Sequence, residues 1–241
     1  MTRDEARSKI IFALDVDSFN AAKHWVSRLS GKVGMFKVGK QLFTAYGPDI
    51  VRMIENFGAG VFLDLKYHDI PNTVAMASRE AARLRVKLFN LHALGGYDMM
   101  ARTMEAIHEE FPEADRPRVL AVTILTSSTE ETLRGVGIER SVEEMVVRLA
   151  LLAKKAGVDG VVASPREVPL IRAACGKNFL IVTPGVRPSF ASADDQKRIM
   201  TPAEAVASGS DFLVIGRPIS AAPDPMVAVE MIVDEITATK S

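Results

Sequence analysis

Short hydrophobic runs alternate with longer, half-polar segments along the whole chain. The runs are rich in Val, Ile, Leu and Phe and are apolar on both faces, which is typical of parallel β-strands covered on each side. They span residues 10–16, 35–39, 61–66, 88–94, 119–125, 160–164, 179–186 and 212–219. The pattern therefore predicts eight buried strands.

The segments between these runs have the periodicity of amphipathic helices. Ser18 is a candidate N-cap, and Ser164 and Thr201 each stand directly before a proline, which is a helix-start signal. The predicted helices span residues 20–29, 71–84, 99–110, 142–156, 165–174, 202–208 and 225–237.

Eight strands that alternate with helical segments in 241 residues match the usual size of a (β/α)₈ TIM barrel, an α/β fold. No linker or low-complexity tract divides the chain, so residues 1–241 are expected to form a single domain. A doubly wound sheet would show a glycine-rich fingerprint after its first strand, but that strand ends in Ala-Leu-Asp-Val-Asp at residues 13–17. The sequence favours the barrel.

The amino-acid composition limits the classes of function that the chain can have. The 30 basic and 30 acidic residues balance, so no global field favours nucleic acid or an anionic membrane, and local groups must bind any anionic ligand. Cys175 is the single cysteine, which fits a reducing compartment. The charged N-terminus has no signal-peptide core, and no apolar run approaches the roughly 20 residues of a membrane span. We expect a soluble cytoplasmic protein.

The segment 64–73, Asp-Leu-Lys-Tyr-His-Asp-Ile-Pro-Asn-Thr, concentrates ionisable groups at the end of a predicted strand. Because side chains alternate along a strand, Asp64 and Lys66 are expected to share one face, with Asp69 in the loop beyond. Desolvating three such groups is costly, and clusters of this kind often mark sites of chemistry. Solvated surface charge is the alternative interpretation.

Polar residues also follow the other strands, at the barrel end where active sites lie. Barrels commonly bind phosphate after strands seven and eight, where Gly216 would permit close backbone approach and Arg217 could form a bidentate contact. The long polar segment 187–198 could fold over a ligand or be a surface excursion. The candidates outside 64–73 are Asp15, Asp17, Lys37, His92, Thr126, Pro184, Arg187, Gln196, Gly216 and Arg217.

The remaining conspicuous residues have structural interpretations. His24 and His108 fall in predicted amphipathic helices, and Cys175 is interpreted as a packing residue. His68 loses the strand alternation that would relate it to Lys66. No metal-ligand spacing such as His-Glu-x-x-His occurs, and no metal is expected.

Taken together, these motifs resemble those of the orotidine 5′-phosphate decarboxylase family. The resemblance spans nearly the whole chain. It includes Ala-Leu-Asp at 13–15, Lys-Val-Gly at 37–39, the block 64–73, Leu-Thr-Ser at 125–127, Thr-Pro-Gly-Val-Arg at 183–187, Asp-Asp-Gln at 194–196 and Ile-Gly-Arg-Pro-Ile at 215–219. An Asp-x-Lys-x-x-Asp pattern alone is shared with 3-keto-L-gulonate 6-phosphate decarboxylase, whereas the extended block is specific.

The resemblance implies a role for each matching residue. Lys66 would donate a proton to C6 of the pyrimidine, and Asp64 would lie beside the departing CO₂ group. The ribose hydroxyls would meet Asp15 and Lys37. The remaining implied substrate contacts are Thr126 at the pyrimidine, Arg187, Gln196, Gly216 and Arg217 at the phosphate and its closing loop, and Pro184.

The resemblance further implies a homodimer in which Asp69, Ile70 and Thr73 enter the neighbouring subunit's site. The implied reaction is decarboxylation of orotidine 5′-phosphate to UMP without a cofactor. Two alternatives stay open: a metal-dependent 3-keto-L-gulonate 6-phosphate decarboxylase, and a non-catalytic nucleotide-binding barrel.

Overall fold

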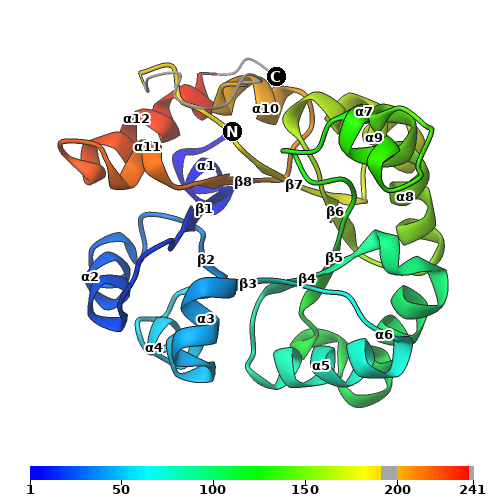
Figure 1. The fold of residues 1–241 in the computed structure, drawn as a ribbon. Coiled ribbons are helices and arrows are strands. Elements are labelled where there is room, and N and C mark those ends of the chain that lie inside the picture. The colour runs from blue at the N-terminus through cyan, green and yellow to red at the C-terminus, as the bar shows by residue number, and fades with distance from the viewer. Residues whose placement is uncertain (191–199, 239–241) are drawn as a thin grey trace. The chain divides into compact units, whose positions relative to one another are not determined.

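A computed structural model describes residues 1–190 and 200–238 of the chain (Figure 1). Its eight strands are hydrogen-bonded in sequence order and close into a barrel, and the pairs β1–β2, β2–β3, β4–β5, β5–β6, β6–β7 and β8–β1 are each parallel. The predicted (β/α)₈ fold is confirmed. The chain divides into two compact units, residues 1–65 with 183–241 and residues 66–182, which are described in turn.

The first unit carries the beginning and the end of the barrel. Its strands are apolar because both faces are covered, and Phe12 and Phe36 meet edge to face with their ring centroids 6.1 Å apart. Its elements are α1 (Arg3–Ser8), β1 (Ile10–Ala13), α2 (Phe19–Leu29), β2 (Met35–Gly39), α3 (Lys40–Tyr46), α4 (Pro48–Asn56), most of β3 (Gly60–Tyr67), the end of β7 (Leu180–Pro184), α10 (Pro202–Ala207), β8 (Phe212–Ile215), α11 (Arg217–Ser220) and α12 (Pro225–Thr237).

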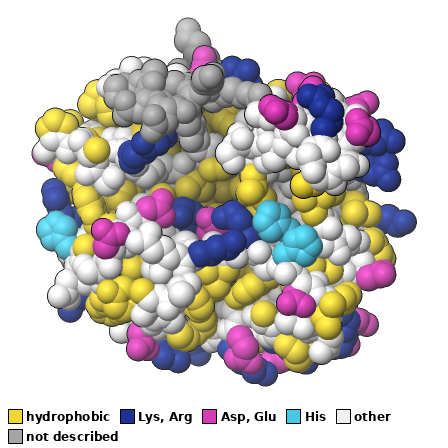
Figure 2. Space-filling model, in the orientation of Figure 1, with side chains coloured by type: hydrophobic (Ala, Val, Ile, Leu, Met, Phe, Trp, Pro, Cys, Tyr) yellow, Lys and Arg dark blue, Asp and Glu magenta, His cyan; other side chains and the backbone are white. Residues whose placement is uncertain are grey.

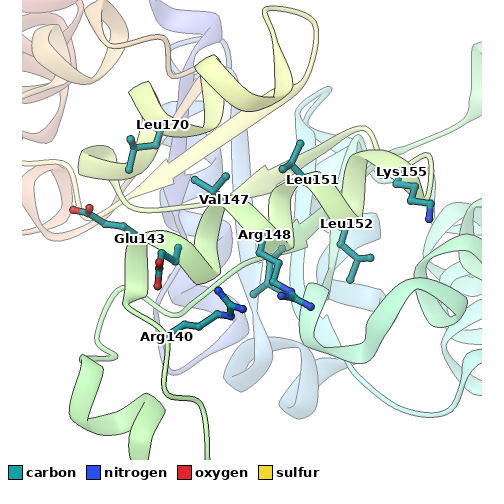
Figure 3. Close-up of a pocket in the computed structure, with 10 residues that line it drawn as sticks. Arg140, Glu143, Val147, Arg148, Leu151, Leu152, Lys155 and Leu170 are labelled. Carbon is teal, nitrogen blue, oxygen red and sulfur yellow. The ribbon is translucent and has the colours of Figure 1, made fainter.

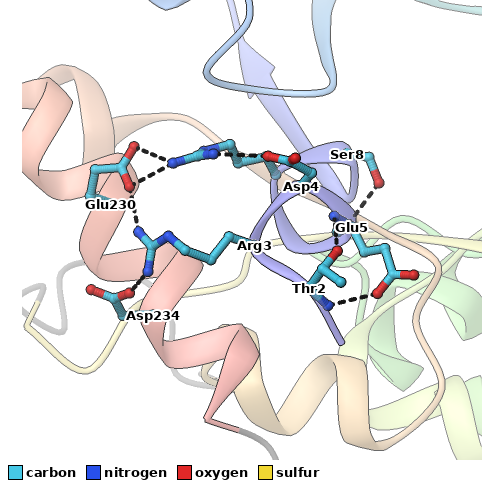
Figure 4. A network of polar contacts seen from close by, with 8 residues as sticks. Thr2, Arg3, Asp4, Glu5, Ser8, Glu230 and Asp234 are labelled. Atoms are coloured by element: carbon cyan, nitrogen blue, oxygen red, sulfur yellow. Dashed lines mark hydrogen bonds and ion pairs between the residues drawn. The ribbon is translucent and has the colours of Figure 1, made fainter.

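Helix α12 packs along α1 and is held there by charge (Figure 4). The Arg3 guanidinium contacts the carboxylates of Glu230 and Asp234, and Arg7 Nη2 lies 2.9 Å from Glu230 Oε2. This group of ion pairs, the clasp of Arg3, Arg7, Glu230 and Asp234, therefore joins α1 to α12.

The second unit carries the middle strands. Helices α5 and α6 pack side by side (Figure 1), and ion pairs cross between them, including Arg79 Nη2 to Glu109 Oε2 at 3.0 Å. Its elements are the end of β3, α5 (Pro71–Arg83), β4 (Leu88–His92), the 3₁₀ turn η1 (Ala93–Gly95), α6 (Gly96–Glu110), η2 (Glu113–Asp115), β5 (Arg118–Val122), α7 (Glu130–Gly135), α8 (Val142–Lys155), β6 (Gly160–Val162), η3 (Pro165–Glu167), α9 (Val168–Cys175) and most of β7.

The predicted elements all occur, with corrections at their ends. Strand one and strands four to eight end earlier than predicted, because the apolar pattern runs on into buried loop or helix residues such as Leu14, Ala93 and Ile219. The predicted helix 165–174 divides into η3 and α9. Within the described residues, five α-helices were not predicted, α1, α3, α4, α7 and α11, nor were the 3₁₀ turns η1 and η2.

Both positive and negative side chains occur on the face shown in Figure 2. Across the described residues, no helix combines the length and apolar character that crossing a membrane requires. The assignment of all 241 residues to one domain stays a prediction.

Candidate active site

Lys37 lies between two carboxylates, those of Asp15 and Asp64. The three residues come from the ends of the first three strands. Lys37 Nζ lies 2.8 Å from Asp15 Oδ1 and 3.7 Å from Asp64 Oδ2. The side chains of Lys37 and Asp64 are only 11% and 14% exposed, whereas that of Asp15 is 67% exposed. Burial strengthens the attraction because less water screens it, and each buried charge has an opposite partner.

Strand register places these groups together. In the parallel pairing Ala13 lies opposite Lys37, and Gly39 lies opposite Asp64. A Cβ on Gly39 would approach Lys37 Nζ to 3.3 Å and Asp15 Oδ1 to 3.7 Å. Glycine at this position therefore leaves room for the ion pair, a role that the sequence interpretation missed.

Asp17, unlike Asp15, forms no ion pair with Lys37 in the described part of the chain and instead stabilises a loop. Its Oδ1 accepts a hydrogen bond of 2.9 Å from Gln41 Nε2 on α3. This contact ties the loop after β1 to the helix after β2, so Asp17 is a loop anchor.

The predicted phosphate residues follow β7 and β8. Pro184 ends β7, and Arg187 three residues later is 8% exposed, with its backbone N–H donating to Met200 O at 3.0 Å. Gly216 precedes α11, and a Cβ there would meet the Ala13 Cβ at 3.1 Å, so this glycine also fits the packing against β1. Arg217 is exposed. Gln196, predicted to contact phosphate, lies outside the described residues.

Lys66 lies on β3 with an unusual backbone. Its φ is +55°, and its N–H donates to Oδ1 of Asn90 on β4 at 2.8 Å. The prediction that Asp64 and Lys66 share a face assumed regular strand geometry, and the backbone departs from that geometry at Lys66.

The segment after β3 is open to solvent. Residues 68–73 are all exposed, including Asp69 and Thr73, and Ile70 retains 67% of its accessible surface. Asp69 Oδ1 accepts the N–H of Ile70 at 2.6 Å, and within the described part of the chain Asp69 forms no ion pair. Thr126 is likewise exposed, in the connection between β5 and α7.

Aromatic side chains make contacts at the end of β3. The rings of His68 and His92 have centroids 5.7 Å apart, and Tyr67 packs on Phe89 at 6.2 Å. Desolvation by burial raises the pKa of Tyr67 from its ordinary 10.0 to about 12. The phenol is therefore neutral at physiological pH.

A separate cavity of about 770 Å³ lies on the outside of α8 and α9 (Figure 3). Its apolar lining comes from Val147, Leu149, Leu151, Leu152 and Leu170, and its charged rim includes Arg140, Arg148 and Glu143. None of the predicted site residues lines it. Among the described residues, no group of three or more His, Cys, Asp or Glu side chains is arranged to hold a metal ion.

The family described as orotidine 5′-phosphate decarboxylase / HUMPS matches residues 8–232. The chain belongs to this family. A relative from Geobacter sulfurreducens named orotidine 5′-phosphate decarboxylase is 74% identical over 238 residues, which cover 99% of this chain and all of the relative. One of the same name from Geotalea uraniireducens is 71% identical over 240 residues, with full coverage of both chains. Relatives of this kind identify the chain as an enzyme, a carboxy-lyase.

Two solved structures have a similar fold. Orotidine 5′-phosphate decarboxylase from Lactobacillus acidophilus aligns with a TM-score of 0.81 at 37% identity, covering 95% of this chain and 99% of that chain. A conserved protein from Geobacillus kaustophilus aligns with a TM-score of 0.80 at 39% identity, covering 94% and 99%.

Proposed function

We propose that this chain decarboxylates orotidine 5′-phosphate to UMP, the product needed for pyrimidine nucleotides, without a cofactor. The observation that carries the proposal is the charged cluster of Lys37 between Asp15 and Asp64, with Lys66 two residues further along β3. The family membership and the relatives' names support the same substrate.

The proposed reaction breaks the bond from C6 to the carboxylate carbon. CO₂ leaves, and the bonding electron pair stays on C6 as a vinyl carbanion with little delocalisation. The Lys66 ammonium donates a proton to C6, and solvent later reprotonates the amine. A charge array already held in place stabilises the developing carbanion with little reorganisation.

Asp64 would lie beside the substrate carboxylate and repel it in the ground state. This repulsion falls as CO₂ departs, but stabilisation of the carbanion is the larger contribution in our proposal. Asp15 and Lys37 would bind the ribose hydroxyls, and Thr126 the pyrimidine.

The phosphate would bind remote from the reacting carbon, to Arg187, Gly216 and Arg217 and, as the family resemblance implies, to Gln196. Arginine suits this role because its planar guanidinium forms paired hydrogen bonds to phosphate oxygens. Binding energy at the phosphate can then favour the transition state at C6.

A spectrophotometric assay tests the proposal against its rivals. Purified protein should lower the ultraviolet absorbance of orotidine 5′-monophosphate equally with and without a chelator. Turnover of 3-keto-L-gulonate 6-phosphate that the chelator abolishes would instead establish the metal-dependent enzyme. Nucleotide binding without turnover of either substrate would establish the non-catalytic barrel.

Lys66→Ala tests the proton donor. General acids commonly contribute 10²–10⁴-fold, so we expect kcat to fall by about 10³-fold or more while UMP still binds. Lys40→Ala, which removes an exposed lysine at the start of α3, is the control and should keep wild-type turnover. A Lys66→Ala variant as fast as the wild type would contradict the mechanism.

We further propose a homodimer in which Asp69, Ile70 and Thr73 complete the neighbouring subunit's site. Their exposure, and the absence of an ion pair for Asp69 among the described residues, support this role. Mixing inactive Asp69→Ala and Lys66→Ala chains should restore part of the activity, because a hybrid dimer contains one intact site. If hybrid dimers form but activity does not recover, the result would count against a shared site. The cytoplasmic location stays a prediction.

A further inference from the structure

Strand β4 buries one polar side chain among apolar ones. Leu88, Phe89 and Leu91 are core residues, and Asn90 between them is fully buried. A buried amide is costly unless its polar atoms are hydrogen-bonded, so a buried Asn in a strand calls for a specific partner. For Oδ1 that partner is the backbone N–H of Lys66, at 2.8 Å.

Lys66 needs such a partner because its backbone is strained. Within the described residues, Lys66 and Arg85 are the non-glycine residues with positive φ, at +55° and +54°. Arg85 follows the end of α5, where a left-handed residue is common. Lys66 lies inside a strand, where the left-handed conformation is unfavourable for a residue with a Cβ and persists only if its surroundings impose it.

The direction of the Lys66 side chain depends on this conformation. If the residue relaxed to ordinary strand geometry, the bond from Cα to Cβ would turn, and the ammonium at the end of a four-carbon chain would move with it. Misplacing a reacting group by about 1 Å can cost about 10²-fold in rate. A proton donor therefore needs its backbone fixed.

We propose that Asn90 is a positioning residue that holds Lys66 in its left-handed conformation and thereby directs the proton donor. The proposal rests on the proposed function for the role of Lys66, but its geometric part does not. Asn90 acts through the backbone of Lys66, so its loss should lower kcat more than it weakens substrate binding.

The kinetic test compares two variants with a control. Asn90→Ala removes the acceptor oxygen, and we expect kcat to fall by about 10²-fold with KM changed less than about threefold. Asn90→Asp keeps an oxygen at the same place and should recover much of the loss. The control is Thr103→Val on α6, which removes a hydrogen bond to Met99 O from another fully buried residue and should leave kcat unchanged.

Unchanged kcat in Asn90→Ala, or an Asn90→Asp variant as slow as Asn90→Ala, would overturn the proposal. If the wild type turns over orotidine 5′-monophosphate in the same assay, either result leaves the proposed function standing.

A measurement on the wild type decides the geometry even if the variants do not fold. In protein labelled with ¹⁵N-lysine, the Lys66 amide should exchange with D₂O at least about 10²-fold more slowly than a free peptide amide. Rapid exchange of this amide would show that the bond to Asn90 does not hold, whatever reaction the enzyme performs.

Discussion

The charged cluster on the first three strands combines a buried and an exposed carboxylate around one ammonium. Asp64 is the buried partner of Lys37 and Asp15 the exposed one. Removing one partner from a buried pair leaves an uncompensated charge, which is more damaging than the loss of a surface pair. The cluster therefore depends on the space around it as well as on its three members.

Gly39→Ala tests that space. The new methyl group would approach Lys37 Nζ to 3.3 Å, so the ammonium must shift by a few tenths of an ångström. We expect kcat/KM to fall by about tenfold, since small displacements in a preorganised site are costly. Gly135→Ala, where nothing lies within 4 Å of the added carbon, should keep wild-type kinetics. Equal kinetics for both variants would refute this steric role of Gly39.

Tyr67 gives a prediction on pH dependence. Its pKa is about 12 in the folded protein against an ordinary 10.0, so the folded state holds the phenol proton more tightly. The stability that Tyr67 contributes is complete below pH 10 and is lost as the pH rises toward 12. Urea unfolding at pH 9 and pH 11 should show a smaller decline in Tyr67→Phe than in the wild type, and parallel declines would disprove the assignment.

At the scale of elements, the strands were predictable from the sequence because their apolar runs are long and bounded by polar residues. Helix α4 also has a readable signal, Pro48 followed by buried Ile50, Val51 and Ile54, and was overlooked. Helices α7 and α11 have six and four residues and form too few turns for a periodic pattern.

Part of the candidate site was also predictable from the sequence. Lys37 and Asp64 stand out as charges in apolar strands, and the pairing of Lys37 with both carboxylates follows from strand register. The backbone of Lys66 does not follow, because a positive φ at a non-glycine residue is imposed by a contact distant in the sequence. The sequence signal that could have indicated this contact was Asn90, a polar residue within an apolar run.

The clasp between α1 and α12 has a testable energetic consequence (Figure 4). The pKa of Glu230 is lowered from its ordinary 4.5, chiefly by the hydrogen bond from Arg3. This stabilisation is complete above pH 4.5 and is lost as the pH falls through the lower folded pKa. We expect Glu230→Gln to lower Tm by about 2–4 °C at neutral pH and low salt, with a smaller effect in acid or high salt.

Glu139→Gln is the matched control, since this exposed glutamate forms no ion pair among the described residues. Thermal unfolding followed by circular dichroism measures all three proteins. If the Tm difference between Glu230→Gln and the wild type grew in acid, the ion pairs of Glu230 would not be its cause.

At the scale of the whole molecule, the open question is the assembly that the proposed shared site requires. Exposed apolar side chains occur on the segment after β3 and on the turn and helix after β4: Ile70 is 67% exposed, Leu94 45% and Tyr97 42%. Single exposed apolar residues are ordinary, but Ile70 is itself one of the residues proposed to enter the partner's site, and a dimer interface would bury such a side chain.

Ile70→Asp tests this assembly. Burying an isoleucine is worth about 1.5–3 kcal/mol, so replacing it with a charge should weaken dimerisation by at least about tenfold. Sedimentation over a range of concentrations should show monomers, and activity should fall with them because the partner's Asp69 is then missing. Met231→Asp, which places the same charge at a 43% exposed apolar position on α12, should change neither property. If Ile70→Asp sediments as the wild type does, Ile70 lies outside the interface and the shared site must be abandoned.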